Sequence, residues 1–190
     1  MFRFACYARH MIPAKNAQPC DALAARILKV NHAGENGAVH IYAGQIWMAR
    51  FTAPSTVAEL VANKADEERH RTIFWTELQR RHRPRCRSYW LCGFGGLALG
   101  LVTGLCGRRA ISATTVAVER VVLRHLAQQL IDLHGKDEAA VQAIASIVAE
   151  ERQHFEHAAS HVSDDRFWLK ILAPVVAAST EAVIWIGMRA

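Results

Sequence analysis

Two copies of the pattern Glu-x-x-His constrain this chain more than any other feature. The copies are Glu67–His70 and Glu151–His154, and their glutamates lie 84 residues apart. Residues i and i+3 of an α-helix share one face, so each copy would present a carboxylate beside an imidazole. Oxygen and nitrogen donors placed side by side can bind one metal ion. The sequence therefore predicts two helices that each carry a pair of metal ligands.

A single glutamate precedes each pair at the same distance. Glu35 lies 32 residues before Glu67, and Glu119 lies 32 residues before Glu151. Four carboxylates and two histidines on four helices form the ligand set of di-iron and di-manganese centres in helical bundles, and the mixture suits iron. The spacing does not indicate which two carboxylates bridge the ions. The six expected ligands are Glu35, Glu67, His70, Glu119, Glu151 and His154.

The residue before each paired glutamate is also acidic, Asp66 in the first half and Glu150 in the second. Acidic side chains near a metal site often bind the free ring nitrogen of a ligand histidine. We expect each to reach the histidine of the opposite half, with plain surface charge as the alternative. A lone Glu-x-x-His is weak support for a metal site. Two matched copies are stronger, because buried carboxylates without metal are costly to desolvate.

The composition fits one domain that touches a membrane surface. A chain of 190 residues is long enough for one four-helix core. Hydrophobic residues make up 52%, and the mean hydropathy of +0.05 is too low for a multi-span membrane protein. The net charge of +6 is concentrated beside an apolar segment, which favours an anionic membrane over nucleic acid. Five cysteines without a C-x-x-C pair argue against disulfides and thiolate metal sites.

Hydrophobic periodicity predicts four bundle helices in one domain over residues 21–190. Residues 1–20 are expected to be a flexible start, since they have no apolar run typical of a secretory signal. Asp21 is the expected N-cap of the first helix, and Thr56-x-x-Glu59 reads as a capping box for the second. The four bundle helices are expected over 21 to about 47, 56 to about 80, about 115–133 and about 137–161. A break at Asp164-Asp165 should precede a last apolar helix over 166–188, which Pro174 is expected to interrupt.

Residues 89–107 form a segment expected to contact a membrane. Five arginines between Arg80 and Arg87 precede Tyr89-Trp90 and the uncharged run Leu91–Gly107. Basic residues, interfacial aromatics and apolar sequence in this order are typical of such segments. The run is slightly short for a span, which needs about 20 apolar residues, so a dip into one leaflet, a buried hairpin or core helix, and a span all stay open. Lys170 and Glu181 favour an interfacial or packed position for the last helix.

Three motifs resemble the demethoxyubiquinone hydroxylase family of ubiquinone biosynthesis. Residues 27–38 with 41–45 are similar to its opening motif, residues 93–100 with 115–119 to its apolar helix and third-ligand segment, and residues 150–157 to its last motif. The resemblance covers about residue 25 to the C-terminus and includes all six expected ligands. It implies an all-α, ferritin-like four-helix bundle with additional apolar helices that contact a membrane.

The resemblance also implies a function. Members of this family are di-iron monooxygenases that use O2 to hydroxylate the ring of a polyprenylated demethoxyubiquinol. The chain would then bind two Fe ions per subunit, a quinol and O2. It would work beside a membrane, with a lipid-binding accessory protein as a further expected partner. The expected location is the cytoplasmic face of a bacterial inner membrane, with the matrix face of the mitochondrial inner membrane as the alternative. No G-x-G-x-x-G motif occurs, so electrons must come from the quinol or an external donor.

Some positions depart from the family pattern. His125 matches it and is a candidate catalytic residue, but Asn36 and Leu126 stand where the family often has tyrosine. A phenol beside the centre is therefore not expected at these positions. Two other functions stay open, namely a membrane quinol oxidase that reduces O2 without hydroxylation and a non-enzymatic ferritin-like iron-binding protein. The oligomeric state is open, and a soluble storage shell fits poorly with Leu91–Gly107.

Overall fold

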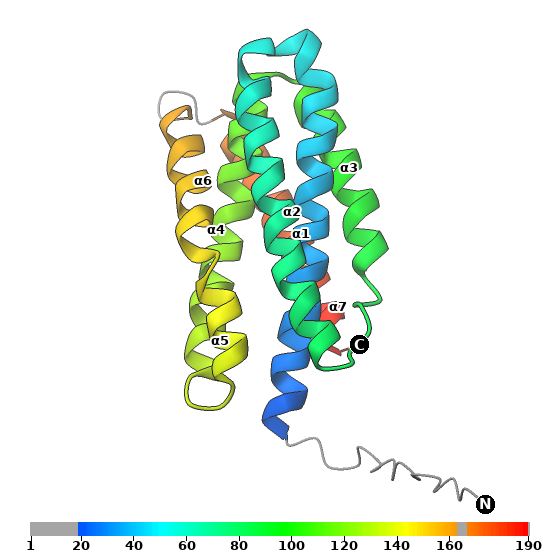
Figure 1. Cartoon of the computed structure of the whole chain (residues 1–190). Coiled ribbons are helices and arrows are strands. Elements are labelled where there is room, and N and C mark those ends of the chain that lie inside the picture. The colour runs from blue at the N-terminus through cyan, green and yellow to red at the C-terminus, as the bar shows by residue number, and fades with distance from the viewer. Residues whose placement is uncertain (1–18, 163–166, 190) are drawn as a thin grey trace, which may run out of the picture.

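A computed structural model describes residues 19–162 and 167–189, and this part of the chain is helical with no strand (Figure 1). The all-α class predicted from the sequence is therefore confirmed. The elements are α1 (Pro19–Thr52), the 3₁₀ turn η1 (Pro54–Thr56), α2 (Val57–Arg80), α3 (Tyr89–Leu105), α4 (Arg108–Leu133), α5 (Glu138–Ala145), α6 (Val148–Ser160) and α7 (Phe167–Arg189).

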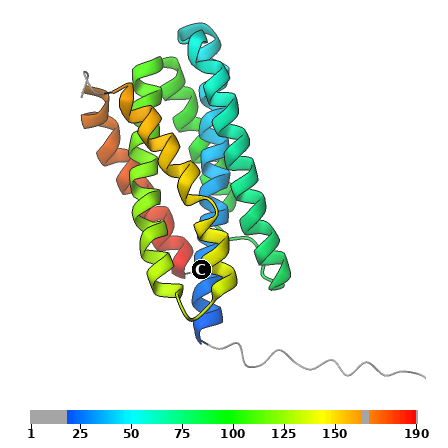
Figure 2. The ribbon, with the colours of Figure 1, turned by 60° about the vertical axis from the view of Figure 1, so that its left-hand side comes forward.

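Helices α1, α2, α4 and the pair α5–α6 form a ferritin-like four-helix bundle. Large apolar side chains from all four meet at its centre, among them Leu28, Phe74, Leu126 and Ile144, each at most 2% exposed. Burying one such side chain contributes about 1.5–3 kcal/mol. Helix α3 packs along α1, and α7 packs along α4, outside the bundle core (Figures 1 and 2). The bundle predicted from the sequence is confirmed.

Glycines on one face of α3 allow it to lie very close to α1. A Cβ atom added to Gly100 would lie 2.1 Å from the carbonyl oxygen of Ile41, and one added to Gly96 would lie 2.3 Å from that of Gly37. Small residues let helix backbones approach in this way. The other face of α3 exposes Trp90 and Phe94, so this helix is not buried on all sides. The glycines of α3 thus allow close packing against α1, in addition to making the segment apolar.

Two predicted helix starts are wrong. Helix α1 begins at Pro19, so Asp21 lies inside the helix and is not its N-cap. Thr56 makes no side-chain cap for α2; its hydroxyl donates instead to the carbonyl oxygen of Ala53 at 2.8 Å. The 3₁₀ turn before α2 holds Thr56 in helical backbone geometry, which a capping residue normally lacks. Residues 1–18 lie outside the described part of the chain.

The single helix predicted over 137–161 is instead two helices, α5 and α6, separated at Ser146 and Ile147. The Ile147 amide donates to the Ile144 carbonyl at 3.4 Å, three residues back, where an α-helix would use the fourth. The Ser146 hydroxyl bonds the Ala143 carbonyl at 2.8 Å, a local bond that competes with regular helix. Helix α6 therefore restarts at Val148, shortly before the second Glu-x-x-His.

Helix α7 runs continuously through Pro174, so the predicted interruption is wrong. Proline removes a hydrogen bond to the carbonyl of Lys170, but both residues are exposed and water can replace that bond. By length and composition, α7 is the one described helix that could cross a membrane, while α3 is shorter. The break predicted at Asp164-Asp165 lies outside the described residues.

Candidate metal centre

All six predicted ligands meet in the middle of the bundle. They form two overlapping groups of buried side chains in which the candidate ligand atoms lie within 4.8 Å of one another. Both groups contain Glu67 and Glu151, so these two carboxylates would be shared by the two ions if a pair were bound. The remaining members are Glu35 and His70 in one group, and Glu119 and His154 in the other.

Each element of the bundle contributes to the centre. Glu35 comes from α1 and Glu119 from α4, while α2 and α6 each contribute one Glu-x-x-His pair. The imidazole rings of His70 and His154 lie with centroids 6.4 Å apart. The restart of α6 at Val148 places Glu151 and His154 in its first two turns, facing α2. Four helices thus bring side chains that lie up to 119 residues apart, from Glu35 to His154, into one site.

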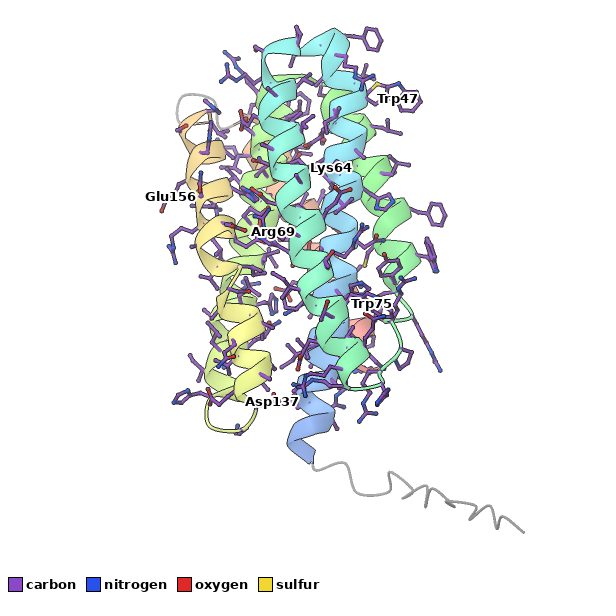
Figure 3. All side chains as sticks on the ribbon, viewed as in Figure 1. Trp47, Lys64, Arg69, Trp75, Asp137 and Glu156 are labelled. Atoms are coloured by element: carbon purple, nitrogen blue, oxygen red, sulfur yellow. The ribbon has the colours of Figure 1, made fainter. Side chains whose placement is uncertain are left out.

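Acidic side chains on the outer side bind the two histidines in a crossed arrangement. Nε2 of His70 lies 2.6 Å from Oε2 of Glu150, and Nε2 of His154 lies 3.2 Å from Oδ2 of Asp66. The contacts expected for Asp66 and Glu150 are therefore present. Arg69, which lies between α2 and α6 in Figure 3, donates to both carboxylates at 2.8 Å. These bonds fix each ring so that its other nitrogen, Nδ1, faces the centre.

The inward-facing atoms fit bound metal. Nδ1 of His70, Nδ1 of His154 and Oε1 of Glu67 are buried and make no hydrogen bond with the described residues. Nδ1 of His70 lies 2.9 Å from a Glu151 oxygen, but without the alignment of a hydrogen bond. Each unsatisfied buried polar atom costs about 1–3 kcal/mol. Two divalent iron ions would satisfy these atoms, and their charge would match that of the four carboxylates.

Without metal ions, the side chains of the centre hold protons instead. Burial, reinforced by the charge of Glu151, raises the pKa of both Glu35 and Glu119 well above the usual range. Burial would also raise the pKa of Glu67, but the adjoining His154 and His70 outweigh it and bring that pKa to about 2. The pKa of His70 rises to about 11, because Glu151 and Glu67 outweigh the opposing effect of burial. Metal binding must therefore release protons from this site.

An apolar cavity of about 370 Å³ connects the centre to the outside of the bundle. Its inner end is formed by Glu35, Glu67, Glu119 and Glu151, and its walls come from α1, α3, α4 and α7. Leu91 and Val175 line the cavity and are also exposed, so it opens between α3 and α7. A Cβ added to Gly34 would meet no atom within 4 Å. The small residues beside Glu35 thus leave room for a ligand.

His125 lies in the wall of this cavity. Its Nε2 is 3.1 Å from Oε2 of Glu181 on α7, and Arg124 pairs with the same carboxylate. Glu181 is therefore turned toward α4, away from any surface that α7 presents to a membrane. The sequence reasoning noted His125 but missed Glu181 as its partner, because the contact joins residues 56 positions apart.

Two further residues near the centre have structural roles that sequence reasoning missed. Tyr42 is buried, its ring steeply inclined to that of His154 with centroids 6.4 Å apart, and burial, reinforced by Glu119, raises its pKa well above the usual range. Its position seven residues after Glu35 could have placed it on the same helix face. Asn36, which stands where the family often has tyrosine, donates to the Tyr89 carbonyl at 3.0 Å and accepts from Arg71 at 2.9 Å. Asn36 thus joins three helices.

Comparison with known proteins places the chain in a family. The family model described as ubiquinone biosynthesis protein COQ7 matches residues 22–187. This chain belongs to that family. The resemblance noted in the motifs is thereby confirmed across most of the chain, from α1 to α7.

Curated relatives of this COQ7-family chain come from bacteria and from mitochondria. A 3-demethoxyubiquinol 3-hydroxylase of Rhodospirillum rubrum is 33% identical over 171 residues, which are 88% of this chain and 79% of the relative. Two relatives are named NADPH-dependent 3-demethoxyubiquinone 3-hydroxylase, mitochondrial. That of Dictyostelium discoideum is 32% identical over 171 residues and that of Homo sapiens 30% over 169, in both cases 86% of this chain and 76% of the relative.

Proposed function

We propose that this chain is a di-iron monooxygenase that hydroxylates the ring of a polyprenylated demethoxyubiquinol with O2. The observation that carries the proposal is the apolar cavity that ends on four buried carboxylates. Family membership and the names of the relatives support the same reaction. Glu35, Glu67, His70, Glu119, Glu151 and His154 would hold the ions. Two iron ions there would supply the redox chemistry with O2 that side chains lack.

The protein side chains would bind and orient the quinol. Its ring would enter the cavity between α3 and α7 and stop against the carboxylates, while its isoprenoid tail would remain near Leu91 and Val175. The apolar walls would keep water from the reacting ring. We assign His125, held by Glu181, to position a quinol hydroxyl. His125→Ala should raise KM for the quinol with bound iron unchanged; an unaltered KM and kcat would contradict this role.

The tail needs a membrane, and the exposed apolar side chains of α1, α3 and α7 supply a surface for one. We call this surface the membrane face, comprising Trp47, Phe51, Trp90, Phe94, Val102, Leu105, Phe167, Ile171, Val175, Trp185 and Ile186. Figure 3 shows Trp47 directed away from the bundle. Exposed apolar patches of this kind mark interaction sites.

We propose that the chain attaches peripherally through this surface, with the exposed Arg85 and Arg87 on anionic lipid. The chain would lie on the cytoplasmic side of a bacterial inner membrane or the matrix side of a mitochondrial one, and an accessory lipid-binding protein could dock on the same face. Trp90→Ala with Phe94→Ala should weaken co-sedimentation with anionic vesicles. Undiminished co-sedimentation would contradict the attachment.

Isotope labelling tests the reaction itself. The reduced, iron-loaded protein would be given a demethoxyquinol and ¹⁸O2, and the quinone product analysed by mass spectrometry. One ¹⁸O atom in the product, absent with Glu119→Ala, is the expected result. Oxygen uptake with only unhydroxylated quinone would indicate a quinol oxidase. No oxygen uptake would favour an iron-binding protein without this activity.

A further inference from the structure

A second cluster of potential metal ligands lies outside the buried centre. It consists of Glu59 on α2, His157 on α6 and His161 at the C-cap of α6, and their donor atoms lie within 4.8 Å of one another. The two histidines are four residues apart on one helix face, with ring centroids 4.9 Å apart. None of the three belongs to the six residues of the centre. The cluster joins the same two helices that carry the Glu-x-x-His pairs.

The spacing of the donor atoms suits a single small cation. Nε2 of His157 lies 3.7 Å from Oε2 of Glu59, which is too long for a hydrogen bond. Two ligand atoms of a tetrahedral zinc ion lie about 3.3 Å apart, given metal–ligand distances of about 2.0–2.2 Å. The side chains of His157 and Glu59 are 51% and 28% exposed, so water could complete the coordination. Such a site exchanges its ion readily with solvent.

The surrounding residues leave the cluster available. Glu59 does not fill the capping role expected for it, because the Thr56 amide, its expected partner, donates to the Ala53 carbonyl instead. Arg108 lies 3.3 Å from the ring nitrogens of His161, and burial together with Arg108 lowers the pKa of that histidine. A neutral imidazole is the form that binds metal. Arg108 is exposed and can turn into solvent when a cation takes its place.

A cleft of about 280 Å³ runs from this cluster toward the buried centre. Its polar lining residues are Glu59, Asn63, Asp66, Gln153, His154 and His157. Each offers an oxygen or nitrogen atom, which a divalent iron ion can use in succession. His154 stands at the inner end as a member of the centre. The residues that line the cleft come from α2 and α6, whereas the apolar cavity opens between α3 and α7.

We propose that Glu59, His157 and His161 form a third divalent-metal site that takes Fe²⁺ from solvent and passes it along the cleft to His154. Metal would then enter from one side of the bundle, and the apolar substrate from another. The delivery role depends on the proposed function, because it requires that the buried centre hold iron. The existence of the outer site does not depend on it.

Metal counting tests the outer site. The metal-free full-length chain would be dialysed against Zn²⁺ at constant free ion concentration, and bound zinc would be measured by mass spectrometry. The chain should bind about three ions, and His157→Ala with His161→Ala about two. His134→Ala, which removes another exposed histidine, is the matched control and should bind about three. Equal counts in the chain and the double variant would overturn the outer site.

Loading kinetics test delivery. With limiting Fe²⁺, the double variant should fill the buried centre more slowly than the chain but reach the same final occupancy. Arg108→Ala should bind the outer ion more tightly. Equal loading rates in the chain and the double variant would overturn the delivery role. The two proposals can fail separately. If the unmodified chain binds one zinc ion more than the double variant, but neither protein takes iron into the buried centre, the outer site stands and the proposed iron centre is refuted.

Discussion

At the residue scale, the candidate metal centre depends on two carboxylates, those of Glu150 and Asp66, that do not line the apolar cavity. Glu150 and Asp66 hold the outer nitrogens of His70 and His154, and Arg69 joins the two acids. Each imidazole is thereby fixed with Nδ1 directed at the four carboxylates of the candidate metal centre. This arrangement crosses between the two halves of the chain, so neither half can form the centre alone.

Removing the charge of Glu150 tests this support. Glu150→Gln should weaken iron binding by about 10–100-fold, because His70 loses the carboxylate that orients it. Glu156→Gln is the matched control, since Glu156 lies on the same helix and points away from the bundle in Figure 3. Equilibrium iron titration with a competing chelator gives the measurement. Equal affinity in the two variants would contradict the orienting role.

A side chain at Gly34 tests whether the cavity is the substrate route. Gly34→Leu should leave folding and iron content unchanged, because a Cβ there meets no atom within 4 Å. The leucine would occupy space beside Glu35 and should lower kcat/KM for the quinol by at least about tenfold, or about 1.4 kcal/mol. Gly34→Ala fills far less of the cavity and is the control. A Gly34→Leu enzyme with unchanged kcat/KM would place the quinol elsewhere.

At the scale of elements, the contact of α1 with α3 sets the wall of the cavity. The backbones touch at Gly37 and Gly96 and again at Ile41 and Gly100. This contact is too close for any side chain between the helices. Its geometry therefore fixes how far α3 stands from Glu35 on α1.

Alanine at two glycines of α3 should have opposite effects. Gly100→Ala places a methyl group 2.1 Å from the Ile41 oxygen and should lower the free energy of unfolding by about 1–3 kcal/mol. Gly95→Ala has nothing within 4 Å and should raise it by up to about 1 kcal/mol through helix propensity. Denaturant unfolding of both variants provides the comparison. Equal stabilities would show that the close contact is absent.

An ion pair between α2 and the start of α5 gives stability a dependence on pH. Arg81 binds both oxygens of Asp137 at 2.6 and 2.7 Å, and this lowers the pKa of Asp137 (labelled in Figure 3). A lowered folded pKa stabilises the protein above the unfolded value of about 4, and this stabilisation is lost as pH falls through the folded value.

Asp137→Asn should therefore destabilise the protein at pH 7 by about 1–3 kcal/mol. The difference from the unmodified chain should shrink as pH falls below about 4, since protonation removes the same charge. Denaturant titrations of both proteins across this pH range would measure it. A difference that stays constant with pH would refute the ion-pair explanation.

At the scale of the whole molecule, the sequence predicted the parts that are periodic. Glu-x-x-His repeats and helical patterning indicated the bundle, and the family resemblance reinforced it. The sequence could not predict the break before α6, because Ser146-Ile147 contains neither proline nor glycine. The sequence also could not show that Glu67 and Glu151 belong to both ligand groups. Their place depends on how four helices converge, and residue spacing along one helix does not define that.

The whole arrangement gives the bundle two distinct sides. The membrane face on α1, α3 and α7 surrounds the mouth of the apolar cavity, α2 and α6 enclose the polar cleft, and the proposed metal centre lies between them. Tail, ring and metal each have a separate place in this scheme. The proposed centre is a pair of iron ions that Glu67 and Glu151, the two carboxylates common to both ligand groups, would bridge.

The measurement that tests this central claim most directly is Mössbauer spectroscopy of the full-length chain loaded with ⁵⁷Fe and oxidised. Two iron ions that share carboxylate bridges couple antiferromagnetically, so the account predicts a diamagnetic ground state with about two ions per chain. Glu67→Ala should weaken the coupling, because Glu151 would remain as the one carboxylate bridge, whereas Glu156→Gln should preserve it. Magnetically isolated ferric ions in the unmodified chain would contradict the account.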